Sequence, residues 1–437
     1  MTVSGLSATL LSMNYLRERV PMRQLQLGFL AILATLLLAA CATQPKPTHS
    51  PHPKPRSNDD VFFPAPYSLQ PQVAFWRNVY AVWGRNKVVF YDNRHMDVIY
   101  EVITLPGPII SGYTPEQKQL LKARRKRLKN LLAQMEYKVA VGAPLSRVEQ
   151  VLASRIRASS GGVRAIAGAS KRLYRQRGLR ERFKRGLEIS GRYNAAFRQI
   201  FRKAGLPDDL AYLPHVESSF QNHAASSVGA AGMWQFMRST ARQYMTVNRA
   251  IDERLDPIIA AESAARYLGN AYSKLGSWPL AITSYNHGVG GMQRAKTAMG
   301  GDIARIVHYY SGRNFGFASR NFYTEFLAAR EVARNHQRYF PEGIRFKAPL
   351  NQDRIRLRQT ATADTVAAYY QVSLSSLNRI NRAWRRAAKR GRVPLPAGSM
   401  VWLPAGTIDR LVRRGIAGRA LALADPVATT RQRRRLR

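Results

Sequence analysis

Residues 213–220 read Leu213-Pro-His-Val-Glu-Ser-Ser-Phe220, and residues 229–236 read Gly229-Ala-Ala-Gly-Met-Trp-Gln-Phe236. The first block holds one acid, Glu217, in an otherwise apolar segment (Tyr212, Leu213, Val216 and Phe220). Apolar surroundings raise the pKa of a carboxyl, because burial disfavours the charged form. A carboxyl that stays protonated near neutral pH is what a general acid needs to cleave a glycosidic bond. The alternative for a lone acid is a structural role at the end of a helix.

The size and composition of the chain bound its organisation. A length of 437 residues predicts two or three domains, and a hydrophobic share of 45% is enough for a sizeable core. The net charge of +43 first suggests nucleic acid as a partner. However, the basic residues are spread along the whole chain, and neither an RNA-binding strand nor a zinc-finger spacing is present. We therefore predict no nucleic-acid partner and expect the charge to favour an anionic cell envelope.

An export signal lies near the N-terminus. Three arginines precede an apolar run over residues 27–40, which has the length of a signal-peptide core and is too short to span a bilayer. The run ends in Leu38-Ala-Ala-Cys41, and Cys41 is the only cysteine. Small residues before a cysteine resemble the lipobox of bacterial lipoproteins, in which the thiol becomes lipidated; the alternative is an ordinary signal peptide. We predict a signal peptide over residues 1–41 and a lipid anchor at Cys41. Because Ala42 and not Asp follows, we predict an outer-membrane lipoprotein facing the periplasm.

The next two segments precede the catalytic region. Residues 42–60 are rich in Pro and polar residues and predict a tether. Residues 61–180 form an accessory region, in which runs at 88–91 and 98–103 predict a β-hairpin. Residues 113–204 predict helices almost throughout, with a helix start at Thr114-Pro115.

The catalytic domain is predicted over residues 181–340, with helices that open at Asp256-Pro257 and Trp278-Pro279. Residues 352–406 change character and predict a strand, two helices and a strand. The remainder, residues 407–437, reads as a basic tail.

Three motifs in order carry a resemblance to a known family. Glu217-Ser-Ser-Phe220, the Gly-Met-Trp-Gln-Phe block and Tyr285-Asn286 with its trailing glycines resemble the soluble lytic transglycosylases of bacterial peptidoglycan. The segment 352–406 is similar to a LysM module, a peptidoglycan-binding fold. Together with the lipobox, the chain resembles the membrane-bound lytic transglycosylase D type. The resemblance implies a mainly α fold: a lysozyme-like helical catalytic domain, a mixed accessory region and a small βααβ module.

The resemblance also implies a reaction. It is the cleavage of the β-1,4 bond between N-acetylmuramic acid and N-acetylglucosamine, with formation of 1,6-anhydromuramic acid by a carbon–oxygen lyase that consumes no water. Two-carboxylate glycosidases need a second acid near the first, and none of the acids near Glu217 in sequence is a convincing partner (Asp208, Asp209, Asp252, Glu253 and Asp256). A single acid suffices if the N-acetyl oxygen of the substrate attacks the anomeric carbon. Glu217 would then act first as acid and afterwards as base, with no cofactor and no metal.

Further site residues follow from the motif positions. By resemblance, Ser218 bonds the catalytic carboxyl, Ser226 contacts the N-acetyl group, and Gln235 contacts sugar. Trp234 offers an aromatic face. The family's second Ser is Val228 here. The remaining substrate-binding candidates are Tyr285, Asn286 and Tyr323, the last standing for a Tyr that the family places against the acid from its final helix. Capping or turn chemistry is the alternative for Ser226, Gln235 and Asn286.

Two other functions are compatible with the sequence. A muramidase on the same fold would hydrolyse the same bond and leave a reducing muramic end. A catalytically silent lipoprotein would bind peptidoglycan without cleaving it. Peptidoglycan glycan strands are the predicted partner in all three cases.

Overall fold

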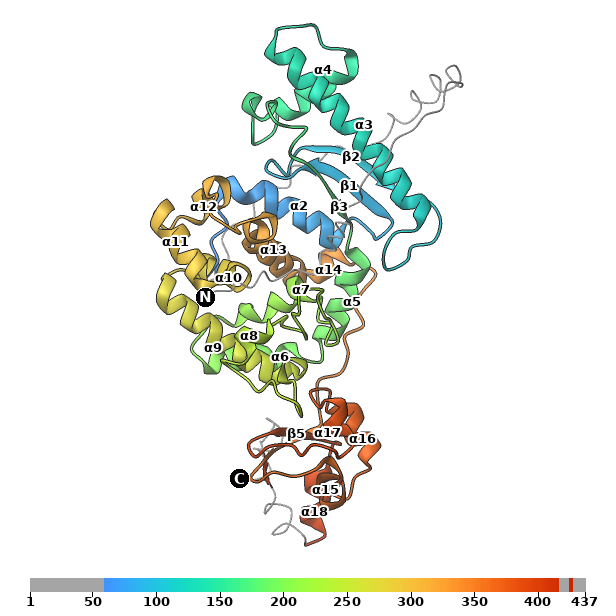
Figure 1. The fold of residues 1–437 in the computed structure, drawn as a ribbon, viewed down its shortest axis with the longest axis vertical. Helices are drawn as coiled ribbons and strands as arrows, with labels where there is room; N and C mark the ends of the chain where they lie inside the picture. Colours follow the sequence, from blue (N-terminus) through green and yellow to red (C-terminus); the bar gives the residue numbers. More distant parts are fainter. Residues whose placement is uncertain (1–58, 416–423, 427–437) are drawn as a thin grey trace.

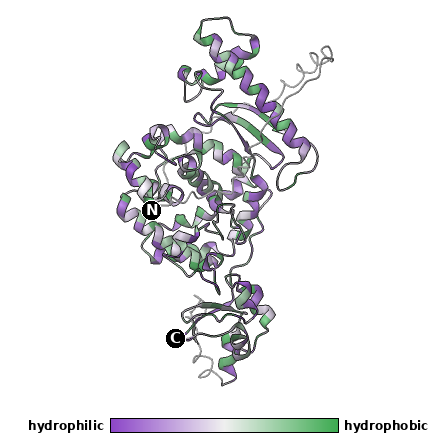
Figure 2. Cartoon of the chain, in the orientation of Figure 1, coloured by the Kyte–Doolittle hydropathy of each residue, from purple (hydrophilic) through white to green (hydrophobic). Residues whose placement is uncertain are grey.

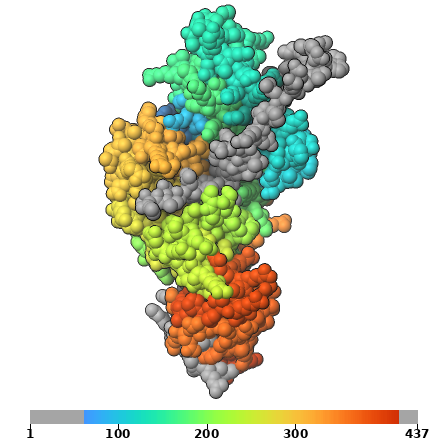
Figure 3. Space-filling model, viewed as in Figure 1, coloured from blue at the N-terminus to red at the C-terminus, as the bar shows by residue number. Residues whose placement is uncertain are grey.

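The computed structural model describes residues 59–415 and 424–426. Three parts follow one another along the long axis of the molecule (Figure 1). A sheet covered by two helices lies at one end, a helical body lies in the middle, and a small module lies at the other end. Figure 3 shows the same division on the surface, with the C-terminal module as a lobe in orange and red.

The N-terminal layer contains an antiparallel sheet of order β2-β1-β3, formed by β1 (Lys87–Asp92), β2 (Ile99–Thr104) and β3 (Leu173–Arg177). The pairing of β1 with β2 confirms the predicted hairpin. The prediction that residues 113–204 are helical almost throughout is wrong at β3, which lies antiparallel to the other side of β1. This strand forms because a long-range partner provides its ladder, and local propensity does not reveal such a partner.

Side chains of β1 alternate between two cores, as the pleat of a strand requires. Val88 and Phe90 pack into a core with α3 (Pro115–Ala140) and α4 (Arg147–Arg157). Val89 and Tyr91 pack into the core of the helical body. Helix α3 begins at Thr114 with a capping box, as predicted from Thr114-Pro115. Figure 2 shows α3 mostly in the hydrophilic colour, since only one stripe of it is buried.

Helix α2 (Gln70–Ala81) packs on α13 (Phe317–Arg334) in the centre of the body. Trp76 is fully buried and its Nε1 donates to Asn321 Oδ1 over 3.3 Å. Phe63 packs edge-on against Phe326, with ring centroids 5.2 Å apart. Residues 61–81, predicted as part of an accessory region, therefore share one hydrophobic core with the segment predicted to be catalytic.

The other helices of the body surround this pair. Asp256 caps α9 by accepting from the N–H groups of Ile258 and Ile259, and α10 begins at Trp278, so both predicted helix starts are confirmed. All five alanines of α9 are at most 3% exposed, which allows close helix packing. The other helices of the N-terminal layer and the helical body are α1 (Asp59–Phe62), η1 (Tyr67–Leu69), η2 (Val163–Ala165), α5 (Arg180–Ser190), α6 (Asn194–Lys203), η3 (Asp208–Tyr212), α7 (Leu213–Glu217), α8 (Arg238–Ala241), η4 (Glu253–Leu255), α9 (Pro257–Leu275), α10 (Trp278–His287), α11 (Val289–Met299), α12 (Ile303–Tyr309) and α14 (His336–Tyr339).

The C-terminal module has the predicted order of strand, helix, helix and strand. Its elements are β4 (Asp353–Leu357), α15 (Ala363–Tyr369), α16 (Leu374–Ile380), α17 (Arg386–Lys389), β5 (Met400–Leu403), α18 (Thr407–Arg413) and β6 (Ala424–Pro426). The segment predicted as a basic tail from residue 407 is in part structured. Leu411 of α18 is 1% exposed in the module core, and β6 pairs with β4.

The module is docked on the body through a polar contact. Trp402 Nε1 donates to Asp256 Oδ2 over 2.6 Å, and Arg385 forms an ion pair with Asp252 at 2.9 Å. The module is therefore held against the loop that precedes α9.

The predicted signal peptide, Cys41 and almost all of the Pro-rich linker lie outside the described residues. Within residues 59–415 and 424–426, no helix has both the length and the apolar character that a bilayer crossing requires.

Candidate active site

Glu217 is the last residue of the short helix α7. Pro214 occupies the first turn of α7, where its missing N–H costs no hydrogen bond. The helix ends because Ser219 and Phe220 adopt positive φ angles of 52° and 58°. A positive φ is strained for residues other than glycine, and such strain clusters at functional sites. Gln235, in the second motif block, also has a positive φ, of 47°.

The surroundings of Glu217 are apolar, as predicted. Its side chain is 0% exposed, and neither carboxyl oxygen has a hydrogen-bond partner among the described residues. His215, on the same helix, stacks on Phe183 with ring centroids 4.8 Å apart, and burial lowers its pKa to about 3, so it is neutral. Burial, followed by the negative charge of Glu325, holds the pKa of Glu217 well above that of an ordinary glutamate.

Glu325 is the residue that the sequence analysis missed. It lies on α13, which packs against α7, and it is 1% exposed with both carboxyl oxygens unpaired among the described residues. Burial raises the pKa of Glu325 to about 8. The expectation of an isolated catalytic acid is therefore wrong, because a second buried carboxyl lies within electrostatic reach of Glu217. Glu325 also sits in an apolar helical segment, so the pattern that singled out Glu217 applies to it too.

The acids closer to Glu217 in sequence are engaged elsewhere. Asp209 forms ion pairs with three arginines of α6 and α13, and Asp252 pairs with Arg254 and Arg385. Asp208 pairs with two arginines of α6, Glu253 accepts from the backbone of Thr246, and Asp256 caps α9. Their exclusion as partners of Glu217, made from sequence, agrees with these contacts.

Two tyrosines are electrostatically coupled to Glu217. Burial, and after it the charges of Glu325 and Glu217, raise the pKa of Tyr80 on α2. Burial, and after it the charge of Glu217, raise the pKa of Tyr285 on α10. Glu217 thus lies where α2, α7, α10 and α13 meet. The sequence did not predict that α2 contributes to the surroundings of Glu217, because α2 lies more than a hundred positions before Glu217 in the chain.

The two serines predicted at the site make local contacts. Ser218 Oγ donates to the carbonyl oxygen of Met233 over 2.7 Å, so the predicted bond to the Glu217 carboxyl is wrong. This contact ties the first motif block to the second. Ser226 is half-buried and accepts from the N–H of Ala230 over 2.9 Å, which is turn chemistry.

The second motif block is buried under the first. Gln235 is 2% exposed, and its Nε2 donates to the carbonyls of Gly232 and Ala224 over 2.7 and 3.1 Å. Its Oε1 has no partner among the described residues. Trp234 is 0% exposed and packs on Phe197, so the predicted open aromatic face is wrong.

Tyr285 and Asn286 join α10 to the site. Tyr285 Oη donates to the carbonyl of Trp234 over 2.8 Å. Asn286 is 4% exposed and its Oδ1 accepts from Ser319 Oγ of α13 over 2.8 Å. These bonds lock α10 between the second motif block and α13.

Tyr323 does not bond Glu217. It is fully buried, and its Oη donates to the carbonyl of Pro64 over 2.7 Å. The side chain of α13 that acts electrostatically on Glu217 is Glu325, two residues further along the helix. The expected support of the acid by Tyr323 is therefore not present.

The arrangement can deliver a proton. An unpaired, desolvated carboxyl keeps its proton at neutral pH and releases it to a base that forms beside it. Among the described residues no group of three or more His, Cys, Asp or Glu is placed to hold a metal ion.

Comparison with known proteins supports the motif assignment. Residues 195–305 match the family described as "Transglycosylase SLT domain". The matched segment contains Glu217 and both motif blocks as well as Tyr285 and Asn286. This match confirms the resemblance to lytic transglycosylases that the motifs predicted.

Individual relatives cover part of the chain. The chain is 30% identical over 195 residues to the "Membrane-bound lytic murein transglycosylase D" of Escherichia coli K12, which covers 41% of this chain and 40% of that protein. It is 32% identical over 95 residues to the "Putative tributyltin chloride resistance protein" of Alteromonas sp., covering 21% of this chain and 46% of that protein. The chain thus spans less than half the length of these curated relatives.

One solved structure is also similar. It is the lytic transglycosylase Slt of Pseudomonas aeruginosa in an inactive mutant form, with 19% identity, a TM-score of 0.25, and coverage of 34% of this chain and 24% of that one. A TM-score this low supports no conclusion about shared architecture.

Proposed function

We propose that this chain, whose residues 195–305 match a transglycosylase SLT domain, is a peptidoglycan lytic transglycosylase. The observation that carries the proposal is the state of Glu217: fully buried, without a hydrogen-bond partner among the described residues, and with a raised pKa. Such a carboxyl is protonated at neutral pH and serves as the general acid.

In the first step, Glu217 gives its proton to the oxygen of the β-1,4 bond between N-acetylmuramic acid and N-acetylglucosamine. The bond from that oxygen to the anomeric carbon breaks, and the N-acetyl oxygen of the same muramic acid bonds to the anomeric carbon. No protein nucleophile is needed. The apolar surroundings keep Glu217 protonated, and thus available as a donor, because they disfavour the carboxylate.

In the second step, the Glu217 carboxylate takes the proton from the 6-hydroxyl of the muramic acid. The hydroxyl oxygen bonds to the anomeric carbon, and the bond to the N-acetyl oxygen breaks. The acid is thereby restored, and the product is 1,6-anhydromuramic acid. No water enters at any point.

The main competing function is a muramidase, in which a second, ionised carboxylate acts. Glu325 is the only candidate that we find for this role among the described residues near Glu217. Burial raises its pKa to about 8, which keeps it protonated near neutral pH and unsuited to act as a nucleophile or base. This favours the lyase over the hydrolase.

The sugar contacts are part of the proposal. We propose that Gln235 and Asn286 shape the groove through the backbone they hold, because their amides are engaged within the protein. Ser226, which is half-buried, remains the candidate for contact with the N-acetyl group. Since Glu217 is 0% exposed, whatever covers it must move before a glycan strand can enter.

The domain organisation and cell location are also proposed. We propose that the helical body begins at residue 61, because α2 shares its core. We propose further that the C-terminal module is a LysM-like glycan binder, and that Cys41 carries a lipid anchor in the outer membrane facing the periplasm. The docking of Trp402 on Asp256 would hold a module-bound strand at a fixed place relative to the catalytic body.

The test is the release of muropeptides from purified sacculi by the full chain and by Glu217→Gln. We expect anhydro ends from the wild type and a loss of roughly a hundred- to ten-thousand-fold in the variant. Glu116→Gln is the matched control, because this glutamate is exposed on α3, outside the helical body, and the variant should keep full activity. Undiminished release by Glu217→Gln would refute the assignment of the acid, and absence of any release by the wild type would favour a silent binder.

A further inference from the structure

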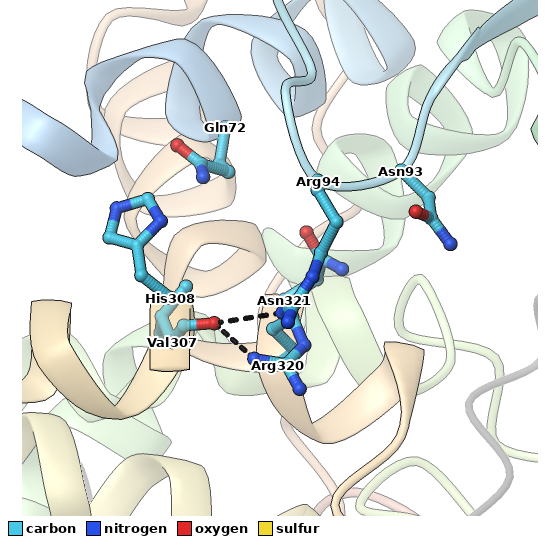
Figure 4. A pocket seen from close by; sticks show the side chains of 7 residues that line it. All are labelled: Gln72, Asn93, Arg94, Val307, His308, Arg320 and Asn321. Carbon is cyan, nitrogen blue, oxygen red and sulfur yellow. Dashed lines mark hydrogen bonds between the residues drawn. The ribbon is translucent and has the colours of Figure 1, made fainter. Parts of the chain in front are cut away.

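A hollow lies where the loop after β1 meets α2, α12 and α13 (Figure 4). It is open to solvent on one side, and the room between its side chains is about 10 Å³, enough for one water-sized group. It is lined by Gln72, Asn93, Arg94, Val307, His308, Arg320 and Asn321. One oxygen atom of an anion therefore fits between the side chains, with the rest of the anion at the open side.

Two arginines from distant parts of the chain converge in this hollow. Arg94 Nη1 donates to the carbonyl oxygen of Val307 over 3.4 Å, and Arg320 Nη1 donates to the same oxygen. Figure 4 shows both guanidinium groups beside that carbonyl. Arg320 Nη2 also donates to the carbonyl of Tyr310 over 2.9 Å. Both guanidinium groups therefore donate hydrogen bonds to neutral carbonyl oxygens.

The nearby carboxylates are committed to other groups. Asp92 bonds Arg172 Nε over 2.8 Å and accepts from the backbone N–H of Arg94. Asp302 caps the N-terminus of α12. Neither forms a salt bridge with Arg94 or Arg320. The negative charge of Asp92 acts on Arg94, but it is shared with Arg172, and the groups that act on Arg320 include no carboxylate among the described residues.

The surroundings disfavour this pair of charges. Burial, and after it the charge of Arg172, lowers the pKa of Arg94. Burial, and after it the charge of Arg94, lowers the pKa of Arg320 to about 10. A negative charge placed between them would reverse both effects.

A buried amide faces the same space. Gln72 of α2 is 4% exposed, and its side-chain oxygen has no hydrogen-bond partner among the described residues. The two ends of an amide are interchangeable by rotation, so Gln72 can present its N–H group to an acceptor instead. An acceptor bound in the hollow would therefore find donors from three separate elements.

We propose that this hollow binds a small oxyanion, namely a carboxylate or a phosphate group, between Arg94 and Arg320. Guanidinium groups bind such oxygens through charge-assisted, often bidentate hydrogen bonds. Because Arg94 belongs to the sheet layer and Arg320 to α13, the bound anion joins the layer to the helical body. The proposal does not depend on Glu217 or on the reaction.

Two sources can supply this chemistry: free phosphate, or the carboxylate of a peptide. The experiment is a calorimetric titration of the full chain with inorganic phosphate, at constant ionic strength set by chloride. A parallel titration uses a small peptide-like carboxylate, N-acetyl-alanine. Saturable binding of phosphate alone identifies the free anion as the source, and saturable binding of the carboxylate identifies peptide ends.

Variants of the two arginines test whether the anion binds in this hollow. We expect Arg94→Gln and Arg320→Gln each to weaken binding at least about tenfold, as expected for the loss of a hydrogen bond to a charged group. Arg164→Gln is the control, since this arginine is exposed in the same layer and the variant loses the same charge. Its affinity should equal that of the wild type.

The proposal is overturned if the wild type binds neither anion, or if Arg94→Gln binds as tightly as the wild type. If Arg320→Gln does not fold, Arg94→Lys takes its place. A lysine keeps the charge but loses the planar donor pair, so it should bind more weakly than the wild type and more tightly than Arg94→Gln. Equal affinity of Arg94→Lys and Arg94→Gln for the anion would show that the positive charge at position 94 does not contribute to binding. That result would refute the proposed site.

Discussion

The buried carboxyl of Glu325 should make the stability of the protein depend strongly on pH. We consider the variant Glu325→Gln, which keeps the shape of the side chain and removes its ionisation. Burial raises the pKa of Glu325 to about 8 in the folded chain, against 4.5 for an ordinary glutamate. Stabilisation linked to this group is fully present below the unfolded value and is lost as the pH rises through the folded value.

The size of the effect follows from the two pKa values. Each unit corresponds to about 1.4 kcal/mol. A carboxyl that titrates at 4.5 in the unfolded chain and at about 8 in the folded chain therefore lowers the free energy of unfolding by up to about 5 kcal/mol across that range. Local opening to water makes this an upper limit. The cost of burying an amide at position 325 is the same at every pH and cancels in the comparison.

The assay is urea denaturation of wild type and Glu325→Gln at about pH 5 and about pH 8. We expect the wild type to lose several kcal/mol more than the variant between the two conditions. Glu116→Gln, at an exposed site on α3, serves as control and should follow the wild type. The free energy of unfolding could instead fall by the same amount, within about 1 kcal/mol, in wild type and Glu325→Gln. Glu325 would then be ionised at pH 8 without cost, and the claim that Glu217 and Glu325 are a desolvated pair would be refuted.

Three further substitutions test the supports of the site. Asp209→Asn should destabilise the protein by about 3–5 kcal/mol, because it removes a buried negative charge that three arginines share. Burial alone would raise the pKa of Asp209, but the arginines hold it below its usual range, so its contribution should vanish as the pH falls; a denaturation midpoint equal to that of the wild type at pH 7 would contradict this. Gly232→Ala should cost at least about 2 kcal/mol, since the new Cβ would lie 1.8 Å from the Arg254 carbonyl oxygen at a φ of 82°, and an unchanged melting temperature would show that the loop is not tight. Trp402→Phe removes the bond to Asp256 and should speed proteolysis between body and module, whereas equal cleavage rates would mean that this bond does not fix the module.

Much of the fold was predictable because its signals are local. The hairpin of β1 and β2, the capping box at Thr114 and the helix start at Asp256 all depend on residues within a few positions of one another. The strand β3 was not predictable in this way, since Leu173–Arg177 becomes a strand through its pairing with β1. The packing of α2 on α13 was not predictable in this way either, because the two helices lie far apart in the sequence.

The site shows the same division between local and distant information. Glu217 was found because its own neighbours in sequence are apolar and become its surroundings in the fold. Glu325 was missed because it reaches Glu217 only through the packing of α13 on α7. The acceptor of the Ser218 hydroxyl was mispredicted for a related reason: the Met233 carbonyl of the second motif block accepts its hydrogen bond in place of the Glu217 carboxyl. The order of the motifs in the sequence predicted which motif blocks come into contact in the fold. It did not predict which atoms form the hydrogen bonds between them.

The central claim is that a protonated Glu217 cleaves the glycan while the substrate closes on itself. The most direct test is digestion of sacculi by the wild-type chain in water enriched in heavy oxygen, followed by mass analysis of the muramic ends. The account predicts anhydro ends that carry no heavy oxygen. Reducing muramic ends with one heavy oxygen each would show that water is the nucleophile, and the proposed mechanism would then be wrong.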